Sequence, residues 1–312
     1  MPPFDPTAAV TPVTGVTPGG IAFDRAASSG APVVLLHAGI ADRRMWDAQW
    51  PELTAARAAV RLDLRGFGDS ATEPQGEWSH ADDVIQTLRH LGIARCHLVG
   101  ASFGSGVAVE VALTAPELVE SLLLCPPGGS LLATMTPDLR RFFDAENDAL
   151  SRGDLDAAVE ANVDAWVVGP RRSASEVDPG IITAVRTMQR RAFDLAESWR
   201  AIAATELDPL ALDRLGDLAV RTLVIVGGHD LDTTQDAASR VVAGIPGARR
   251  IDWPDAAHLP SLEKPQTFLD LLLEWTAAGP NLIPTSGATG SMRNHPPHGG
   301  GGPAREAPDS RA

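Results

Sequence analysis

The chain has 312 residues, of which 44% are hydrophobic, so it can bury the core of one large α/β domain or of two average ones. Its formal net charge of −14 argues against a nucleic-acid-binding protein, because such proteins neutralise phosphates with clustered Lys and Arg. We therefore expect a globular protein that binds no nucleic acid.

The two ends of the chain lack the periodicity of packed elements. Residues 1–18 are rich in Pro, Thr, Ala and Gly, and we expect them to form a flexible N-terminal arm. From residue 279 the composition shifts to Asn, Pro, His and Gly, and includes the run Gly299–Gly302. Such a segment cannot bury enough apolar surface to order itself, so we expect 279–312 to be a disordered tail.

Between these ends, short aliphatic runs alternate with segments of helical period. This alternation is typical of an α/β protein with a mostly parallel sheet and helices on both faces. In chain order, the predicted strands cover 33–36, 60–64, 97–99, 121–125, 222–226 and 250–253. The predicted helices cover 46–59, 79–92, 103–115 and 265–277. The helix in 79–92 has Ser79 as its N-cap and ends at Gly92.

The alternation breaks between residues 130 and 215. This stretch has helical patterns over 139–151, 155–167 and 181–204 and no aliphatic strand. An all-helical insertion between two sheet-forming parts indicates a lid over the carboxyl edge of the sheet, where open α/β sheets bind ligands. We therefore expect a core made of 19–129 and 216–278 and a helical cap made of 130–215.

The segment 98–106 turns from one apolar run through small residues into another. A strand that reverses into a helix within a few residues requires close backbone packing, which Gly100, Gly104 and Gly106 allow because they have no Cβ. The run Gly100-Ala101-Ser102-Phe103-Gly104 has the G-x-S-x-G pattern of a nucleophile elbow. It predicts acyl-transfer chemistry at Ser102 if a base and an acid lie elsewhere. The alternative is a serine that is merely small enough for a tight turn.

The candidate base and acid follow later predicted strands. His258 comes after the strand 250–253, and Asp230 comes after the strand 222–226, so both are expected at the same sheet edge as Ser102. A histidine can take the serine proton, and a carboxylate can fix the tautomer of that histidine. Asp232, two residues beyond Asp230, is the second candidate for the acid.

Four motifs make the sequence resemble the α/β-hydrolase superfamily, and within it the capped esterase, lactonase and C–C hydrolase group. The resemblance covers about residues 20 to 278. The motifs are His37-Ala38-Gly39 with Trp46, which is similar to an oxyanion-hole H-G-x…W segment; Asp63 to Ser70, which is similar to D-x-R-G-x-G-x-S; the elbow; and His258 with Glu263-x-Pro265, which is similar to H-x4-E-x-P.

The resemblance implies the α/β-hydrolase fold and assigns a role to individual residues. Ser102 would attack the substrate carbonyl, His258 would move the proton, and Asp230 would orient His258. The backbone N–H groups of Gly39 and Phe103 would form the oxyanion hole.

Two departures from the family pattern bear on these assignments. Ala38 replaces the usual glycine after the histidine of the oxyanion segment. The usual G-E-x-D acid segment reads Gly227-Gly228-His229-Asp230, which keeps the aspartate and loses the glutamate, so Asp232 stays open as the acid.

The implied activity is that of a cofactor-free serine hydrolase acting on an ester, lactone or related acyl bond of a small, mostly apolar molecule. Two alternatives stay open. The same triad can serve C–C bond hydrolysis, lyase or perhydrolase chemistry, and the fold also occurs in non-catalytic ligand receptors. In the cap, Trp166, Phe142 and Phe143 are candidates for lining the substrate pocket, with packing between helices as the alternative.

Other residues carry structural expectations. His97, in the middle of a strand, is expected to be a core residue, and Arg65 and Asp69 are expected to be a structural pair within their loop. Cys96 and Cys125 lie in apolar runs, which favours buried free thiols over a disulfide or a metal pair.

We expect no metal and no cofactor, and a cytoplasmic location. No Cys/His cluster has metal-ligand spacing, and Val109 stands where a dinucleotide-binding loop starting at Gly104 requires its third glycine. The first residues lack the basic start and apolar core of a signal peptide, and no apolar run reaches the roughly 18 residues of a membrane-spanning helix. The sequence does not predict the oligomeric state.

Overall fold

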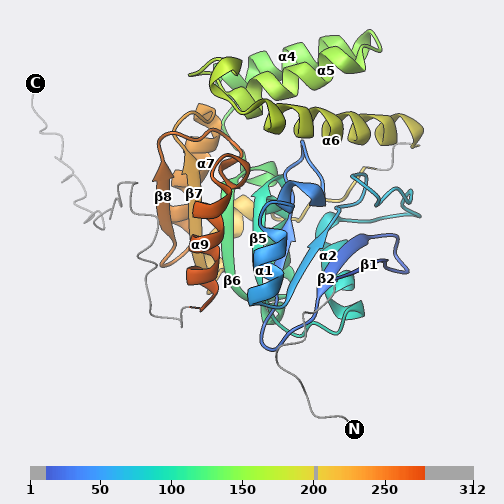
Figure 1. Ribbon diagram of the computed structural model, residues 1–312, viewed down its shortest axis with the longest axis vertical. Coiled ribbons are helices and arrows are strands. Elements are labelled where there is room, and N and C mark those ends of the chain that lie inside the picture. Colours follow the sequence, from blue (N-terminus) through green and yellow to red (C-terminus); the bar gives the residue numbers. More distant parts are fainter. Residues whose placement is uncertain (1–11, 200–202, 278–312) are drawn as a thin grey trace, which may run out of the picture.

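The computed structural model of the chain describes residues 12–199 and 203–277. Within these residues, an eight-stranded sheet has helices on both faces, and three further helices lie across one end of it (Figure 1). The strand order is β1-β2-β4-β3-β5-β6-β7-β8. β2 pairs antiparallel with both β1 and β4, and all other neighbours pair parallel. The predicted mostly parallel α/β sheet is confirmed.

The strands are β1 (Val13–Val16), β2 (Ala22–Ala26), β3 (Val33–Leu36), β4 (Ala59–Leu62), β5 (Cys96–Ser102), β6 (Val119–Pro127), β7 (Arg221–Gly227) and β8 (Arg249–Trp253). The α-helices are α1 (Trp50–Ala56), α2 (His80–His90), α3 (Phe103–Thr114), α4 (Pro137–Ser151), α5 (Leu155–Asn162), α6 (Pro179–Ser198), α7 (Asp232–Gly244), α8 (Pro260–Glu263) and α9 (Pro265–Ala277). Among the shorter helical turns are η1 (Arg43–Trp46), η6 (Ala211–Asp217) and the π-helix η4 (Val163–Val168), which continues α5.

Both faces of the sheet are buried, because successive side chains of a strand point to opposite sides. Along β3, Val33 and Leu35 pack with α1 and α9, whereas Val34 and Leu36 pack with α2, α3 and α7. Burial on both faces explains why the parallel strands appear in the sequence as continuous aliphatic runs rather than as alternating ones.

The helical insertion forms α4, α5 and α6 and lies over one end of the sheet (Figure 1). In the described part of residues 130–215 there is no strand, as predicted. Phe142, Trp166 and Val185 of this insertion belong to the same buried cluster as the α1 and α9 side chains. The lid, as we name α4–α6 and the turns between them, therefore packs onto one layer of the core.

Several local predictions hold. α2 begins at Ser79, whose hydroxyl accepts a hydrogen bond from the amide of Asp82 at 3.0 Å. Cys96 and Cys125 are buried and unpaired. His97 is a core residue, 3% exposed.

The N-terminal region differs from the expectation. β1 lies inside the expected arm, 1–18, and pairs antiparallel with β2, which was not predicted either. Val13 and Val16 of β1 are 62% and 61% exposed, so this strand has little of the burial that marks the other strands in the sequence. Residues 1–11 and the expected tail, 279–312, lie outside the described residues.

Two helical segments also differ from the prediction. The helix expected over 46–59 is divided into η1 and α1, and the strand that follows begins at Ala59. Helix α7, after β7, was not predicted. None of the helices in the described parts of the chain is long and apolar enough to cross a membrane.

Burial of His97 predicts a contribution to the pH dependence of stability. Its Nδ1 lies 2.9 Å from the Ser121 hydroxyl, and burial lowers the pKa of the imidazole from 6.5 to about 4. Between these two values the unfolded chain binds a proton that the folded chain does not, so the free energy of unfolding falls as the pH drops through this window. We expect a shallower fall in His97→Gln than in the wild type.

The measurement is urea unfolding at several pH values between 6.5 and 4. His90→Gln, at an exposed position of α2, is the control. Parallel curves for the wild type and His97→Gln would contradict the prediction.

Candidate active site

The turn between β5 and α3 holds Ser102 in a strained conformation. Its φ of 50° and ψ of −111° make it the one described residue other than glycine with a positive φ. Gly100 and Gly104 let the two segments pack closely: a Cβ on Gly100 would lie 2.3 Å from the carbonyl oxygen of Gly104. Strain of this kind persists only where the surroundings enforce it, and here it places the hydroxyl on the outside of the turn.

A chain of hydrogen bonds joins Ser102, His258 and Asp230. His258 Nε2 lies 2.7 Å from Ser102 Oγ, and His258 Nδ1 lies 2.8 Å and 2.9 Å from the two carboxylate oxygens of Asp230. His258 is 2% exposed and Asp230 is fully buried. Since a carboxylate accepts from Nδ1–H, this arrangement leaves the Nε2 lone pair directed at the serine hydroxyl.

The topology of the sheet brings these three residues together. β5, β7 and β8 are parallel members of one sheet, and each residue lies at the carboxyl end of one of these strands or in the loop that follows. The amide of Leu231 donates to Asp230 Oδ1 at 2.7 Å and holds the carboxylate in place.

Asp232 does not contact His258. Its carboxylate forms an ion pair with Arg171, and its side chain is 59% exposed at the first turn of α7. Of the two candidate acids, the structure places Asp230 against the histidine.

The two residues predicted to form the oxyanion hole, Gly39 and Phe103, lie close together. A Cβ on Gly39 would be 3.3 Å from Phe103 Cβ, so the two backbones are close. Phe103 is the first residue of α3, where N–H groups have no partner within the helix and can bind an anion.

His37 holds the loop that carries Gly39. Its Nδ1 donates to the carbonyl oxygen of Ala38 at 2.8 Å, and its Nε2 accepts from the amide of Leu64 at 2.9 Å. Burial lowers the pKa of His37, in keeping with a neutral ring that donates at one nitrogen and accepts at the other. Ala38 in place of glycine is fully buried.

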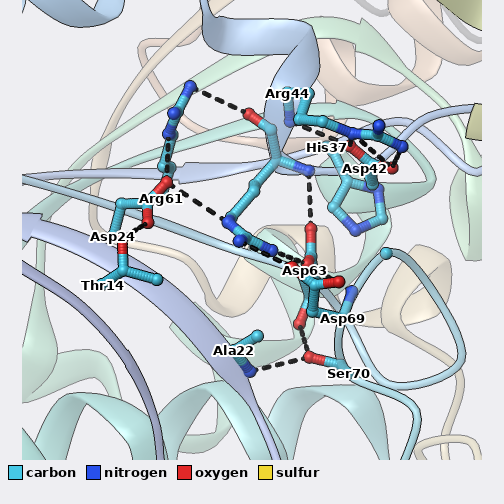
Figure 2. A network of polar contacts seen from close by, with 12 residues as sticks. Thr14, Ala22, Asp24, His37, Asp42, Arg44, Arg61, Asp63, Asp69 and Ser70 are labelled. Carbon is cyan, nitrogen blue, oxygen red and sulfur yellow. Dashed lines mark hydrogen bonds and ion pairs between the residues drawn. The ribbon is translucent and has the colours of Figure 1, made fainter.

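The loop from Asp63 to Ser70 is held by buried polar contacts, which Figure 2 shows. The carboxylate of Asp63 accepts from the amides of Arg43 at 2.7 Å and Asp69 at 2.8 Å and pairs with the guanidinium of Arg43. The hydroxyl of Ser70 donates to the carbonyl oxygen of Asp63 at 2.7 Å and accepts from the amide of Ala22 at 2.8 Å. This motif therefore holds Arg43, in the segment that follows Gly39, against the end of β4.

The expected pair between Arg65 and Asp69 is wrong. Arg65 binds Asp83 of α2 through two hydrogen bonds of 2.6 Å, and Asp69 binds Arg43 at 2.8 Å. Both residues keep structural contacts, but their partners come from other elements, which the spacing within one loop does not reveal.

The three aromatic candidates of the lid differ in position. Trp166 is 7% exposed, and its ring centroid lies 4.4 Å from that of His258. Phe142, also buried, packs against Trp166 at 5.2 Å. Phe143 is 37% exposed and contacts Phe142 rather than Trp166 or His258. The structure thus brings Trp166 to the histidine, with Phe142 behind it, and leaves Phe143 further out.

Sequence reasoning missed the contact of Gly128 with Ser102. A Cβ on Gly128 would lie 2.7 Å from Ser102 Oγ, closer than side-chain carbons approach. In the sequence, Gly128 belongs to a Pro-Pro-Gly-Gly run that indicates only the end of a strand.

Two hollows of about 150 Å³ and 340 Å³ lie away from this site, lined by residues including Thr17 and His90 in one and Arg25 and Arg95 in the other. Across 12–199 and 203–277, no three His, Cys, Asp or Glu side chains gather in a way that could hold a metal ion.

Comparisons with known proteins identify the family to which the chain is similar. The sequence profile of the Alpha/beta hydrolase family matches residues 33–271. The putative carbamate hydrolase RutD of Klebsiella pneumoniae (strain 342) is 28% identical over 260 residues, covering 80% of this chain and 92% of RutD.

Two solved structures are similar over most of their length. Est816, described as an N-acyl homoserine lactone degrading enzyme, has a TM-score of 0.65 and 25% identity, covering 82% of this chain and 98% of Est816. A thermophilic esterase from Thermogutta terrifontis has a TM-score of 0.63 and 26% identity, covering 86% of this chain and 98% of the esterase.

Gly128 provides a test of the packing around Ser102. The backbone of Gly128 is extended, with φ of −167°, so alanine can adopt it, but the new Cβ would displace both the hydroxyl and the backbone of Ser102. We expect Gly128→Ala to lower kcat for an activated ester by about 100-fold, the scale of a misplacement of about 1 Å.

Gly216→Ala is the matched control, because a Cβ there meets no atom within 4 Å. Thermal unfolding of Gly128→Ala shows whether a loss of activity comes from a displaced Ser102 in a folded protein or from a protein that does not fold. Wild-type activity in a folded Gly128→Ala protein would contradict the prediction.

Proposed function

The chain belongs to the alpha/beta hydrolase family, and on this premise we propose that it is a serine hydrolase that cleaves an ester, lactone or related acyl bond of a small, mostly apolar molecule. The observation that carries the proposal is the hydrogen-bond chain from Ser102 through His258 to Asp230, with distances of 2.7 Å and 2.8 Å.

The proposed reaction begins with attack of Ser102 Oγ on the substrate carbonyl. The serine proton passes to His258 Nε2, and the buried carboxylate of Asp230 stabilises the imidazolium that forms. Collapse of the tetrahedral intermediate breaks the acyl bond, and His258 returns the proton to the leaving group. A water molecule, deprotonated by His258, then attacks the acyl-enzyme and releases the acid and free Ser102.

The amides of Gly39 and Phe103 are the proposed donors to the oxyanion. Their backbones are adjacent, and the Phe103 amide lies at the N-terminus of α3, where the partial positive charge of the helix favours an anion. In related chemistry the loss of one such donor costs about 100- to 1000-fold in kcat.

The proposed substrate class follows from the side chains around the triad and from the relatives. The Trp166 ring lies 4.4 Å from that of His258, and Phe103, the residue after Ser102, has its ring 6.0 Å from that of Phe67, so aromatic side chains of both the lid and the core lie near the triad. An apolar acyl or leaving group would be desolvated here at little cost. Est816 and the Thermogutta terrifontis protein are described as lactone-degrading and as an esterase.

Carbamate hydrolysis is the second candidate function. It is favoured by the match to RutD, a putative carbamate hydrolase, over 92% of that protein's length. The same serine would attack a carbamate carbonyl. A carbamate differs from an ester in the nitrogen bound to its carbonyl carbon, which either leaves or remains on the acyl group when the bond is cleaved.

A fluorophosphonate probe tests the nucleophile. We expect it to label the wild type, with the modified peptide containing Ser102, because the Oγ is activated by His258 and half-buried at the sheet edge. Ser102→Ala should lose the label and lower ester turnover by about 10⁴-fold or more.

Ser239→Ala, at an exposed serine of α7, is the control. A panel of p-nitrophenyl esters, an N-acyl homoserine lactone and an alkyl carbamate then separates the bond classes. Intact labelling of Ser102→Ala would overturn the assignment, and labelling without turnover of any of these compounds would favour another reaction on the same triad or a receptor.

The two aspartates give opposite expectations. Asp230→Asn keeps the size of the side chain but favours the wrong histidine tautomer, so we expect kcat to fall by about 10⁴-fold. Asp232→Asn removes the exposed pair with Arg171, leaves the hydrogen bond from Arg171 to the Asp230 carbonyl oxygen, and is the matched control, with activity near that of the wild type. Steady-state kinetics on one ester measures both, and equal losses would contradict the role of Asp230.

A further inference from the structure

Two consecutive arginines of the lid each bind one of the loops that carry the triad. Arg171 donates to the backbone carbonyl oxygen of Asp230 and pairs with Asp232, so it contacts the acid loop. Arg172 pairs with Glu263, which belongs to α8, directly after the loop of His258. The lid is thus fastened to both loops by neighbouring residues.

Arg172 closes the end of the π-helix η4. Its Nε donates to the carbonyl oxygen of Val168 at 2.8 Å, and its Nη2 donates to that of Val167 at 2.7 Å. Carbonyl groups at the end of a helix have no partner within it, and a cation there is favoured. With its side chain 5% exposed, Arg172 is a buried cap rather than a surface charge.

Glu263 links this cap to the histidine loop. One carboxylate oxygen accepts from Arg172 Nη1 at 2.5 Å, and the other accepts from the amide of Ala257 at 2.8 Å. Ala257 directly precedes His258 in the chain. Since the Glu263 side chain is only 10% exposed, each of its oxygens depends on a protein partner, and the lid and the histidine loop share this one carboxylate.

The segment that Arg172 caps carries Trp166, whose ring lies 4.4 Å from that of His258 with an interplanar angle of 46°. An aromatic ring beside an imidazole excludes water from that side and stabilises the imidazolium electrostatically. The end of η4 has little room to move: a Cβ on Gly169 would lie 2.4 Å from the carbonyl oxygen of His229.

We propose that Arg172 and Glu263 are positioning residues for His258, because their ion pair holds η4 so that Trp166 stays against the imidazole. This inference rests on the proposed function, in which His258 moves the proton. Neither residue touches the reacting atoms. A buried ion pair is in general a weak contributor to net stability, which favours a role in placing the segments it joins.

Kinetics of Arg172→Gln, Trp166→Ala and the double variant on p-nitrophenyl acetate test the proposal. We expect Arg172→Gln to lower kcat by about 10- to 100-fold and to change KM by a smaller factor, because the placement of Trp166 affects the proton transfer at His258 more directly than it affects binding of this small acetyl ester. If Arg172 acts through Trp166, the double variant loses no more than about the larger of the two single losses.

Arg172→Lys and Glu263→Gln test the same proposal if Arg172→Gln does not fold. Lysine retains the charge, but its single ammonium group cannot bind all three acceptors of the planar guanidinium, so Arg172→Lys should recover part of kcat. Glu263→Gln should lower kcat as Arg172→Gln does. The matched control is Arg186→Gln, which removes an exposed lid pair with Glu160, and it should leave kcat unchanged.

The outcomes separate this inference from the proposed function. A wild type without Ser102-dependent turnover would overturn the proposed function itself. An active wild type with unchanged kcat in Arg172→Gln, or with losses that multiply fully in the double variant, would overturn the positioning role and leave the function intact.

Discussion

The backbone reversal at Ser102 is the constraint on which the rest of the site depends. A residue other than glycine at φ 50° and ψ −111° costs free energy, on the order of 1–3 kcal/mol, and needs neighbours that leave it no alternative. Gly100, Gly104 and Gly128 provide these neighbours through backbone that approaches more closely than any side chain would allow. The hydroxyl is consequently presented to His258 at the edge of the sheet.

Beside the nucleophile, a buried polar scaffold holds the loop that carries Gly39. Arg43, which follows this loop, forms an ion pair with Asp63, and His37 accepts a hydrogen bond from the amide of Leu64, after β4. Burying such charges is expensive, so their value lies in the single geometry in which all partners are satisfied. The scaffold explains why the motif from Asp63 to Ser70 accompanies a hydrolase-like site without touching the triad.

The lid covers this site as part of the same core. Trp166 shares a buried cluster with side chains of α1 and α9, and its ring contacts the His258 ring at a tilt of 46°. In the proposed arrangement, Arg172 and Glu263 transmit the position of the lid to the histidine loop through one shared carboxylate. Substrate choice and proton transfer would then depend on the same few lid residues, since the segment that shields the base also faces the substrate.

The sequence by itself determined the parallel sheet and the order of Ser102, Asp230 and His258, because buried parallel strands form unmistakable aliphatic runs and their following loops share one edge. It did not reveal β1, whose exposed valines carry no burial pattern, nor α7. Only the tertiary structure shows the partners of Arg65 and Asp69, the close approach of Gly128 to Ser102, and which of Asp230 and Asp232 contacts His258. Each depends on residues brought together from distant parts of the chain, and a charge or a glycine does not specify its partner until packing removes the alternatives.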